Sequence, residues 1–182
     1  MSANIKPQLT HMAIFVNDLA IMQEFYTRVF GLTVTDKGPH PMAPVDMVFM
    51  SASPTEHHQF VLVTGRPESV EFNIVQQMSF LVQSLAELRE MRDRVNAAGI
   101  EVKRACTHGN AWSIYFDDPE GNQVEVYVQS PWYIPQPHIH PIDLDQPDGE
   151  IMHLTEAHCR ESKGFMPRTE RETKMRGMMG LA

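Results

Sequence analysis

The sequence lacks the features of a membrane, secreted or nucleic-acid-binding protein. It has no apolar run near the roughly 20 residues that cross a bilayer, and the first ten residues lack the apolar core of a signal peptide. Lysine and arginine number 15 against 23 acidic residues, a net charge of −8, and form no basic block. A surface for phosphate backbones or anionic lipid is therefore not expected. We predict a soluble, cytoplasmic protein without a nucleic-acid or membrane partner.

Cysteine is also scarce. The two cysteines, Cys106 and Cys159, are too few for a disulfide framework, and they lack the short spacing of zinc or redox sites. We therefore predict free thiols. Histidine and proline are more frequent, at nine and 13 residues, and five of the prolines lie within residues 131–147. Because proline fixes φ and removes a backbone donor, this stretch should not continue a sheet.

The first 130 residues contain a repeated pattern. Residues 9–16 predict an apolar strand, Asp18 can cap a helix with one apolar face, and Gly31 supplies its left-handed end. The pattern returns 66 residues later: residues 77–82 predict a strand, and Ser84 begins a second helix. Glu87 completes a capping box with Ser84, and Gly99 ends that helix.

Three further strands are expected after each helix. They are residues 32–34, 47–50 and 59–63 in the first copy, and 100–102, 113–116 and 123–128 in the second. We therefore predict an α+β fold of two βαβββ modules that form a cupped mixed sheet with helices outside. The first module covers residues 7–68 and the second residues 73–130, and residues 131–182 form an irregular, Pro-rich and charged C-terminal tail.

Strand parity predicts where a site lies, because alternate side chains point to opposite faces of a sheet. One parity is apolar, as a helix-covered face requires: Met12, Ile14, Val16, Val61, Val63, Met78, Phe80, Val82, Ile114, Phe116, Val124, Val126 and Val128. The other parity collects the polar groups His11, His58, Gln77, Ser113, Tyr115, Glu125 and Tyr127. We therefore expect a metal or substrate site on the face that the helices leave free.

Taken singly, these polar residues also have structural interpretations. A histidine near a strand start, such as His11, is commonly a hydrogen-bonded structural residue. Glu125 lies between two valines, and burying its carboxylate is costly without a cation or strong donors, unless the strand edge faces water. A histidine, a glutamate and a tyrosine together on one face indicate a metal site with acid–base partners.

The segment HGNAWSIYFDDPEGNQVEVYV, residues 108–128, resembles the vicinal oxygen chelate superfamily. This superfamily includes glyoxalase I, fosfomycin and bleomycin resistance proteins, and type I extradiol catechol dioxygenases, and it is built from paired βαβββ modules. The resemblance covers residues 9–128 and is strongest to the extradiol dioxygenases. In those enzymes two histidines and a glutamate hold iron. The equivalent positions here are His11, Gln77 and Glu125.

The resemblance also implies catalytic residues. The paired histidine in EHHQFVLV places His58 on one active-site histidine, His108 matches a second, and Tyr115 matches the tyrosine that bonds the substrate oxygen. Leu62 stands where glyoxalase I needs a carboxylate. Gln77 departs from the two-histidine, one-carboxylate set of oxygen-activating iron, because an amide oxygen is a weaker ligand for iron than imidazole.

The expected function is therefore metal-dependent extradiol cleavage of a catecholic ring, with Fe(II) favoured over Mn(II), Zn(II) or Ni(II). The expected partners are a small aromatic diol or another vicinal-oxygen substrate, O2, and further copies of the chain. A glyoxalase-like lyase, isomerase or transferase and a metal-free small-ligand-binding protein are the alternatives. In the tail, His138 and His140 have chelating spacing, but the flanking prolines favour a structural role, and Trp132 should anchor the tail.

Overall fold

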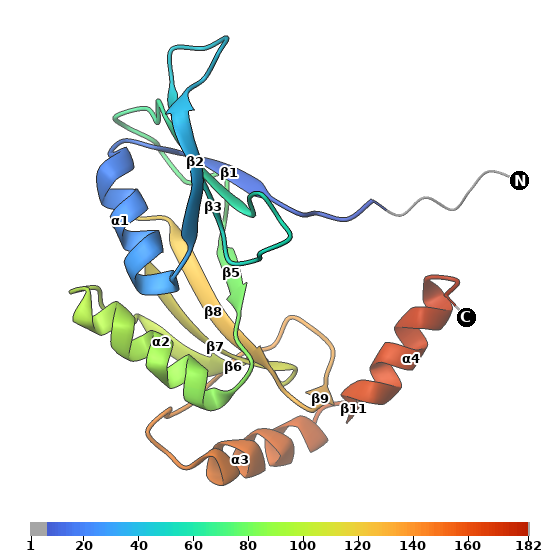
Figure 1. Ribbon diagram of the computed structural model, residues 1–182. Coiled ribbons are helices and arrows are strands. Elements are labelled where there is room, and N and C mark those ends of the chain that lie inside the picture. The colour runs from blue at the N-terminus through green and yellow to red at the C-terminus, as the bar shows by residue number, and fades with distance from the viewer. Residues whose placement is uncertain (1–6, 182) are drawn as a thin grey trace, which may run out of the picture. The chain divides into compact units, whose positions relative to one another are not determined.

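The computed structural model describes residues 7–181, and the chain divides into two compact units between Asn73 and Ile74 (Figure 1). The first unit contains β1 (Met12–Val16), α1 (Leu19–Phe30), β2 (Thr33–Pro39), β3 (Asp46–Ser51) and β4 (Phe60–Thr64). Its sheet has the order β1-β4-β3-β2, in which β1 and β4 run parallel and the other pairs antiparallel. This is one complete βαβββ module.

Helix α1 begins and ends where the sequence predicts. The Asp18 carboxylate accepts hydrogen bonds from the backbone N–H groups of Ala20 and Ile21, both at 2.9 Å. Gly31 ends the helix with φ of 69°, a conformation that favours glycine. The ring of Tyr26 packs on Phe60 of β4 with centroids 4.6 Å apart, so the helix covers one face of this sheet.

The predicted parity of β4 is wrong by one residue. The register pairs Ile14 with Leu62 and Ala13 with Val61, so Leu62, and not Val61 or Val63, shares the face of Ile14. The run FVLV is apolar on both faces and buried throughout. Because such a run has no polar–apolar alternation, the sequence carried no information about which side chains face the helix.

The second unit opens with the same order of elements. These are β5 (Met78–Leu81), α2 (Leu85–Ala97), β6 (Arg104–Thr107), β7 (Ala111–Asp117) and β8 (Gln123–Gln129). The sheet order is β10-β6-β7-β8-β5, with β5 parallel to β8. Helix α2 packs on β7 and β8. Two βαβββ modules with helices on the sheets confirm the predicted α+β fold class, and the strands form two separate sheets.

The capping box of α2 is present, with one change. The Ser84 hydroxyl accepts from the Glu87 N–H at 3.1 Å, while the Glu87 carboxylate accepts from the N–H of Gln83 at 2.7 Å. The predicted strand over residues 100–102 is wrong, because β6 begins at Arg104. The first pairing bond with β7 runs from the Lys103 N–H to the Tyr115 carbonyl, at 2.8 Å.

The tail is more regular than predicted. It contains β9 (Trp132–Tyr133), β10 (His140–Pro141), α3 (Asp148–Arg160), β11 (Met166–Pro167) and α4 (Arg168–Met178), shown from orange to red in Figure 1. Strands β9 and β11 pair with each other, and β10 joins the edge of β6. None of the helices described in residues 7–181 is long and apolar enough to span a bilayer.

Prolines precede the two helices and end the strands β10 and β11, and they do not prevent these elements. Pro147 and Pro167 stand at the N-cap positions of α3 and α4, where the absent N–H of proline breaks no helical hydrogen bond. Trp132 is buried as predicted, and its ring meets Trp112 of β7 edge to face at 6.1 Å. The indole N–H of Trp112 donates to the Thr155 hydroxyl of α3 at 2.8 Å, so the C-terminal segment packs directly on the second sheet.

Candidate functional site

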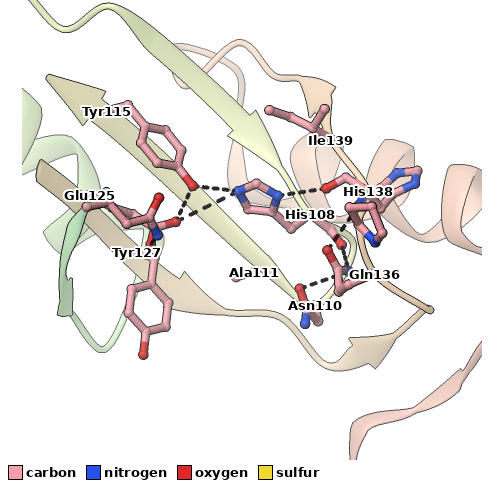
Figure 2. Close-up of a pocket in the computed structure, with 11 residues that line it drawn as sticks. His108, Asn110, Ala111, Tyr115, Glu125, Tyr127, Gln136, His138 and Ile139 are labelled. Carbon is pink, nitrogen blue, oxygen red and sulfur yellow. Dashed lines mark hydrogen bonds and ion pairs between the residues drawn. The ribbon is translucent and has the colours of Figure 1, made fainter. Parts of the chain in front are cut away.

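A pocket of about 960 Å³ lies on the second sheet, on the side opposite its apolar face (Figure 2). Its lining comes from β7 and β8, from the residues just before β5 and β7, and from residues 136–139 of the C-terminal segment. The pairing register places Tyr115 and Glu125 at neighbouring positions of one face, as the parity predicted, with Ser79 on the other side of Glu125. Four predicted site residues line this pocket: Gln77, His108, Tyr115 and Glu125.

Glu125 is the centre of a hydrogen-bond network. The residue is 7% exposed, and one carboxylate oxygen accepts from the Gln77 amide at 2.9 Å and from the Ser79 hydroxyl at 2.6 Å. The other oxygen accepts from the Tyr115 hydroxyl at 2.5 Å. Burying a carboxylate is costly without strong donors, and these three neutral donors offset that cost.

His108 extends the network. Its Nδ1 lies 2.7 Å from the backbone carbonyl of His138, and its Nε2 lies 2.8 Å from the Tyr115 hydroxyl oxygen (Figure 2). A carbonyl accepts and cannot donate, so Nδ1 carries a proton. The single Tyr115 proton goes to Glu125, so the Tyr115 oxygen links Nε2 of His108 to the carboxylate. Nε2 also lies 3.8 Å from the Glu125 carboxylate.

Tyr115 is held as a proton donor. Burial and the adjacent Glu125 carboxylate raise the pKa of Tyr115 well above its usual value. The Arg104 guanidinium lies over the ring at 4.2 Å from its centroid. Burial likewise raises the pKa of the Cys106 thiol to about 11, so this cysteine is a protonated thiol near neutral pH and a weak nucleophile.

The other two predicted site residues lie in the first unit. His11, before β1, and His58, before β4, meet edge to face with ring centroids 4.5 Å apart. His57 joins them, with its Nδ1 at 2.9 Å from Nδ1 of His58 and its Nε2 at 2.8 Å from Asp36. Burial, followed by the charges of His11 and His57, lowers the pKa of His58. The structure thus brings two of the six predicted residues together in the first unit and four in the second.

Three residues that contribute hydrogen bonds to this site were not predicted from the sequence. Ser79 lies two residues after Gln77 on the same strand face, and this spacing was the signal that could have identified it. Gln136 donates from its side chain to the His108 carbonyl at 2.7 Å. His138 contributes a backbone carbonyl, which every residue type possesses, so the sequence offers no signal for that contact.

The side chains around Glu125 limit how a metal ion could be bound there. Among the residues that the structure describes, no group of three or more histidine, cysteine, aspartate or glutamate side chains is placed to hold a metal ion. The Gln77 side chain is a further oxygen donor beside Glu125. The Gln77 amide faces Glu125 with its nitrogen, and turning the amide over presents its oxygen. A carboxylate and an amide oxygen fit a hard divalent cation such as Mn(II).

Comparison with known proteins identifies the family. The chain is 28% identical over 131 residues to biphenyl-2,3-diol 1,2-dioxygenase 3 of Rhodococcus globerulus, covering 69% of this chain and 65% of that enzyme. The chain therefore spans just under two thirds of the length of this relative. It also shares 24% identity over 129 residues with biphenyl-2,3-diol 1,2-dioxygenase 2 of the same organism, covering 68% of this chain and 64% of that enzyme.

Solved structures share the fold. A glyoxylase/bleomycin resistance protein/dioxygenase domain from Frankia sp. EAN1pec aligns with a TM-score of 0.59 at 18% identity, covering 69% of this chain and all of that domain. The fosfomycin resistance protein FosX from Listeria monocytogenes, solved with Mn(II) and sulfate, aligns with a TM-score of 0.55 at 20% identity and covers 69% of this chain and 95% of FosX. Residues 8–126 match the family model itself, so the chain belongs to the Glyoxalase/Bleomycin resistance protein/Dioxygenase superfamily.

Proposed function

We propose that the chain is a metal-dependent extradiol-type dioxygenase, or a close relative, that cleaves a catecholic ring with O2. The observation that carries this proposal is the linked set of His108, Tyr115 and Glu125 in the wall of the pocket. An imidazole and a phenol that share a proton path beside a carboxylate suit a substrate that presents two adjacent hydroxyl groups. The names of the two curated relatives support the same substrate class.

Each of the proposed catalytic residues then has a role that belongs to a particular atom. The Tyr115 hydroxyl orients a substrate oxygen by hydrogen bonding, and His108 holds at Nε2 a proton that it can return to an oxygen of the opened ring. His58, the second proposed acid–base histidine, already contacts His11. A hydroxyl at Tyr115 cannot act as a base near neutral pH, because its pKa is raised.

The proposed metal ligands of the second unit are Gln77 and Glu125, with Fe(II) as the favoured ion, and His11 of the first unit is the further ligand that the resemblance implies. When bound, such a cation supplies a Lewis acid for two adjacent substrate oxygens and a position for O2. Ser79 donates to the same Glu125 oxygen as Gln77, so Ser79 would hold the carboxylate in place when Gln77 turns its amide oxygen toward the ion.

A metal-free ligand-binding protein is the second candidate. Both Glu125 oxygens are already satisfied by Gln77, Ser79 and Tyr115, so the buried carboxylate needs no ion for its stability. In that case the His108 ring and the Tyr115 hydroxyl would bind an oxygen-bearing planar ligand without reaction. Metal content separates the two candidates directly.

The test begins with metal analysis of freshly purified protein and of Glu125→Ala. Glu101→Ala is the control, because Glu101 is an exposed carboxylate. The protein is then loaded with Fe(II) without oxygen, mixed with catechols that carry substituents of increasing size, and exposed to air. We expect oxygen uptake and yellow ring-opened products from the wild type and from Glu101→Ala, and none from Glu125→Ala. Fully metallated wild type that consumes no oxygen with any catechol would overturn the dioxygenase proposal.

The Gln77→His variant tests the departure from the iron-binding pattern. Imidazole binds Fe(II) more strongly than an amide oxygen, so this change should raise iron retention and the rate of ring cleavage. Ser79 and Tyr115 still donate to Glu125 in the variant, which preserves most of the network. A variant with unchanged iron retention would show that residue 77 is not a ligand.

A further inference from the structure

The C-terminal segment contributes one wall of the pocket. Gln136, Pro137, His138 and Ile139 line it together with His108, although they lie outside residues 8–126, which match the superfamily (Figure 2). Pro137 and Ile139 are apolar, whereas the opposite lining carries Tyr115 and Glu125. The pocket therefore has one wall suited to an apolar ring and another suited to its oxygen substituents.

Two hydrogen bonds attach this segment to His108. The His138 carbonyl accepts from Nδ1 of the His108 ring at 2.7 Å, and the Gln136 amide donates to the His108 backbone carbonyl, also at 2.7 Å. The Gln136 side-chain oxygen accepts from the His138 N–H at 3.1 Å. Because Nδ1 is held by the carbonyl, Nε2 is the nitrogen that faces Tyr115.

His138 is in turn held by α3. Its Nε2 lies 2.9 Å from Nε2 of His158, so one imidazole donates to the other, and the His140 ring stacks on His158 with centroids 4.5 Å apart. Helix α3 also packs against the turn that follows His108. Gly109, with φ of 78°, allows this approach, because a Cβ there would lie 2.4 Å from Ile134 and 3.1 Å from the Cys159 sulfur.

We propose that His158 is a positioning residue for His108 and acts through His138. The imidazole–imidazole bond fixes the loop that carries the His138 carbonyl, and that carbonyl fixes the direction of the His108 ring. The proposal rests on the proposed function for its catalytic consequence, because it makes helix α3 part of the acid–base site. It assigns this role to a segment that the superfamily match does not include.

The test compares His158→Phe with His153→Phe. Both residues lie on α3, but His153 is exposed, so the control carries the same substitution away from His138. The readout is the hydrogen-bonded ring N–H of His108 in the NMR spectrum of the ligand-free protein, identified by its absence in His108→Gln. We expect this resonance in the wild type and in His153→Phe, and its loss through exchange with water in His158→Phe. His158→Gln, which can still bond to His138, should restore it in part.

A His108 N–H resonance in His158→Phe that matches the wild type would overturn the proposal. Circular dichroism of both phenylalanine variants checks that α3 remains folded, and His158→Gln provides the second variant if His158→Phe does not fold. In the metal-loaded protein, loss of this positioning should lower kcat roughly 10- to 100-fold. This is the range observed when a hydrogen-bond partner that orients a residue of a metal site is removed. The NMR result needs neither metal nor turnover. If the His108 N–H resonance depends on His158 as expected but no ring cleavage is found, only the proposed function is overturned.

Discussion

The two modules carry the same cross-strand positions with opposite chemistry. In the first sheet, Val61 pairs with Ala13 on one side and with Phe49 on the other. In the second sheet, Glu125 occupies the equivalent position between Ser79 and Tyr115. One backbone arrangement therefore supports an apolar set in one copy and a hydrogen-bonded polar set in the other.

This difference shows what a buried carboxylate requires. Glu125 is buried together with donors from both neighbouring strands and from Gln77, whereas the two strand partners of Val61, Ala13 and Phe49, have no side-chain donor. The two predicted site residues of the first module, His11 and His58, lie outside its strands, before β1 and β4. The chemistry of the second module thus depends on a set of side chains and not on the fold alone.

The largest effect is expected from placing the carboxylate in the wrong module. Val61 is 2% exposed, and Val61→Glu would bury a charge without a donor, at a cost of about 3 kcal/mol or more in the free energy of unfolding. Urea unfolding measures this cost. The combined change Ala13→Ser, Phe49→Tyr and Val61→Glu should recover part of it. Equal stability of the single and triple variants would contradict the claim that donors on the neighbouring strands stabilise a buried carboxylate.

The reverse exchange comes next. Glu125→Val leaves the donors of Gln77, Ser79 and Tyr115 without their acceptor, so we expect a loss of about 1–3 kcal/mol in the free energy of unfolding. Adding Ser79→Ala and Tyr115→Phe recreates the apolar set of the first module and should restore stability. Activity should be abolished in both variants. A triple variant less stable than Glu125→Val would contradict the equivalence of the two sheets.

Removing one hydroxyl sharpens the comparison further. Tyr115→Phe takes one donor from Glu125 and separates it from His108, with an expected stability loss of about 1 kcal/mol. If the hydroxyl stabilises charge on the substrate oxygen, kcat should fall roughly 100-fold or more. Steady-state kinetics on a catechol checks this, with Tyr133→Phe as the matched control, because Tyr133 lies on β9 outside the pocket lining. Equal kcat values for the two variants would remove Tyr115 from the mechanism.

The smallest expected effect concerns acid pH. Burial, then the nearby His158, His140 and His108, lowers the pKa of His138 from 6.5. The unfolded chain therefore binds a proton more readily than the folded protein, so this contribution to stability is present above about pH 6.5 and is lost as pH falls through the lower folded pKa. Thermal unfolding of His138→Gln should show a weaker loss on acidification than His153→Gln. Identical pH profiles would contradict the assignment.

The sequence predicted the repeated module and the polar face of the second sheet. The 66-residue offset placed both helices with their caps, because Asp18 and Ser84 have side chains suited to that position. The second face was predicted because polar and apolar residues alternate along β8. Gln77, Tyr115 and Glu125 line one pocket together with His108, which the alternation did not predict.

Other parts could not be predicted for physical reasons. A strand that is apolar on both faces, such as β4, has no alternation to fix its parity. Proline content indicated an irregular tail, although Pro147 and Pro167 precede helices and do not interrupt them. The contact between His108 and the His138 carbonyl depends on backbone position in the folded chain, which residue types do not encode locally.

The most direct test of the central claim is calorimetric binding of a catechol to the anaerobic, Fe(II)-loaded protein. The wild type is compared with the triple variant Ser79→Ala, Tyr115→Phe and Glu125→Val, which carries the apolar set of the first module. We predict saturable binding with one site per chain for the wild type and no measurable binding for the triple variant. Equal affinity in the two folded proteins would contradict the assignment of the site to the Glu125 network.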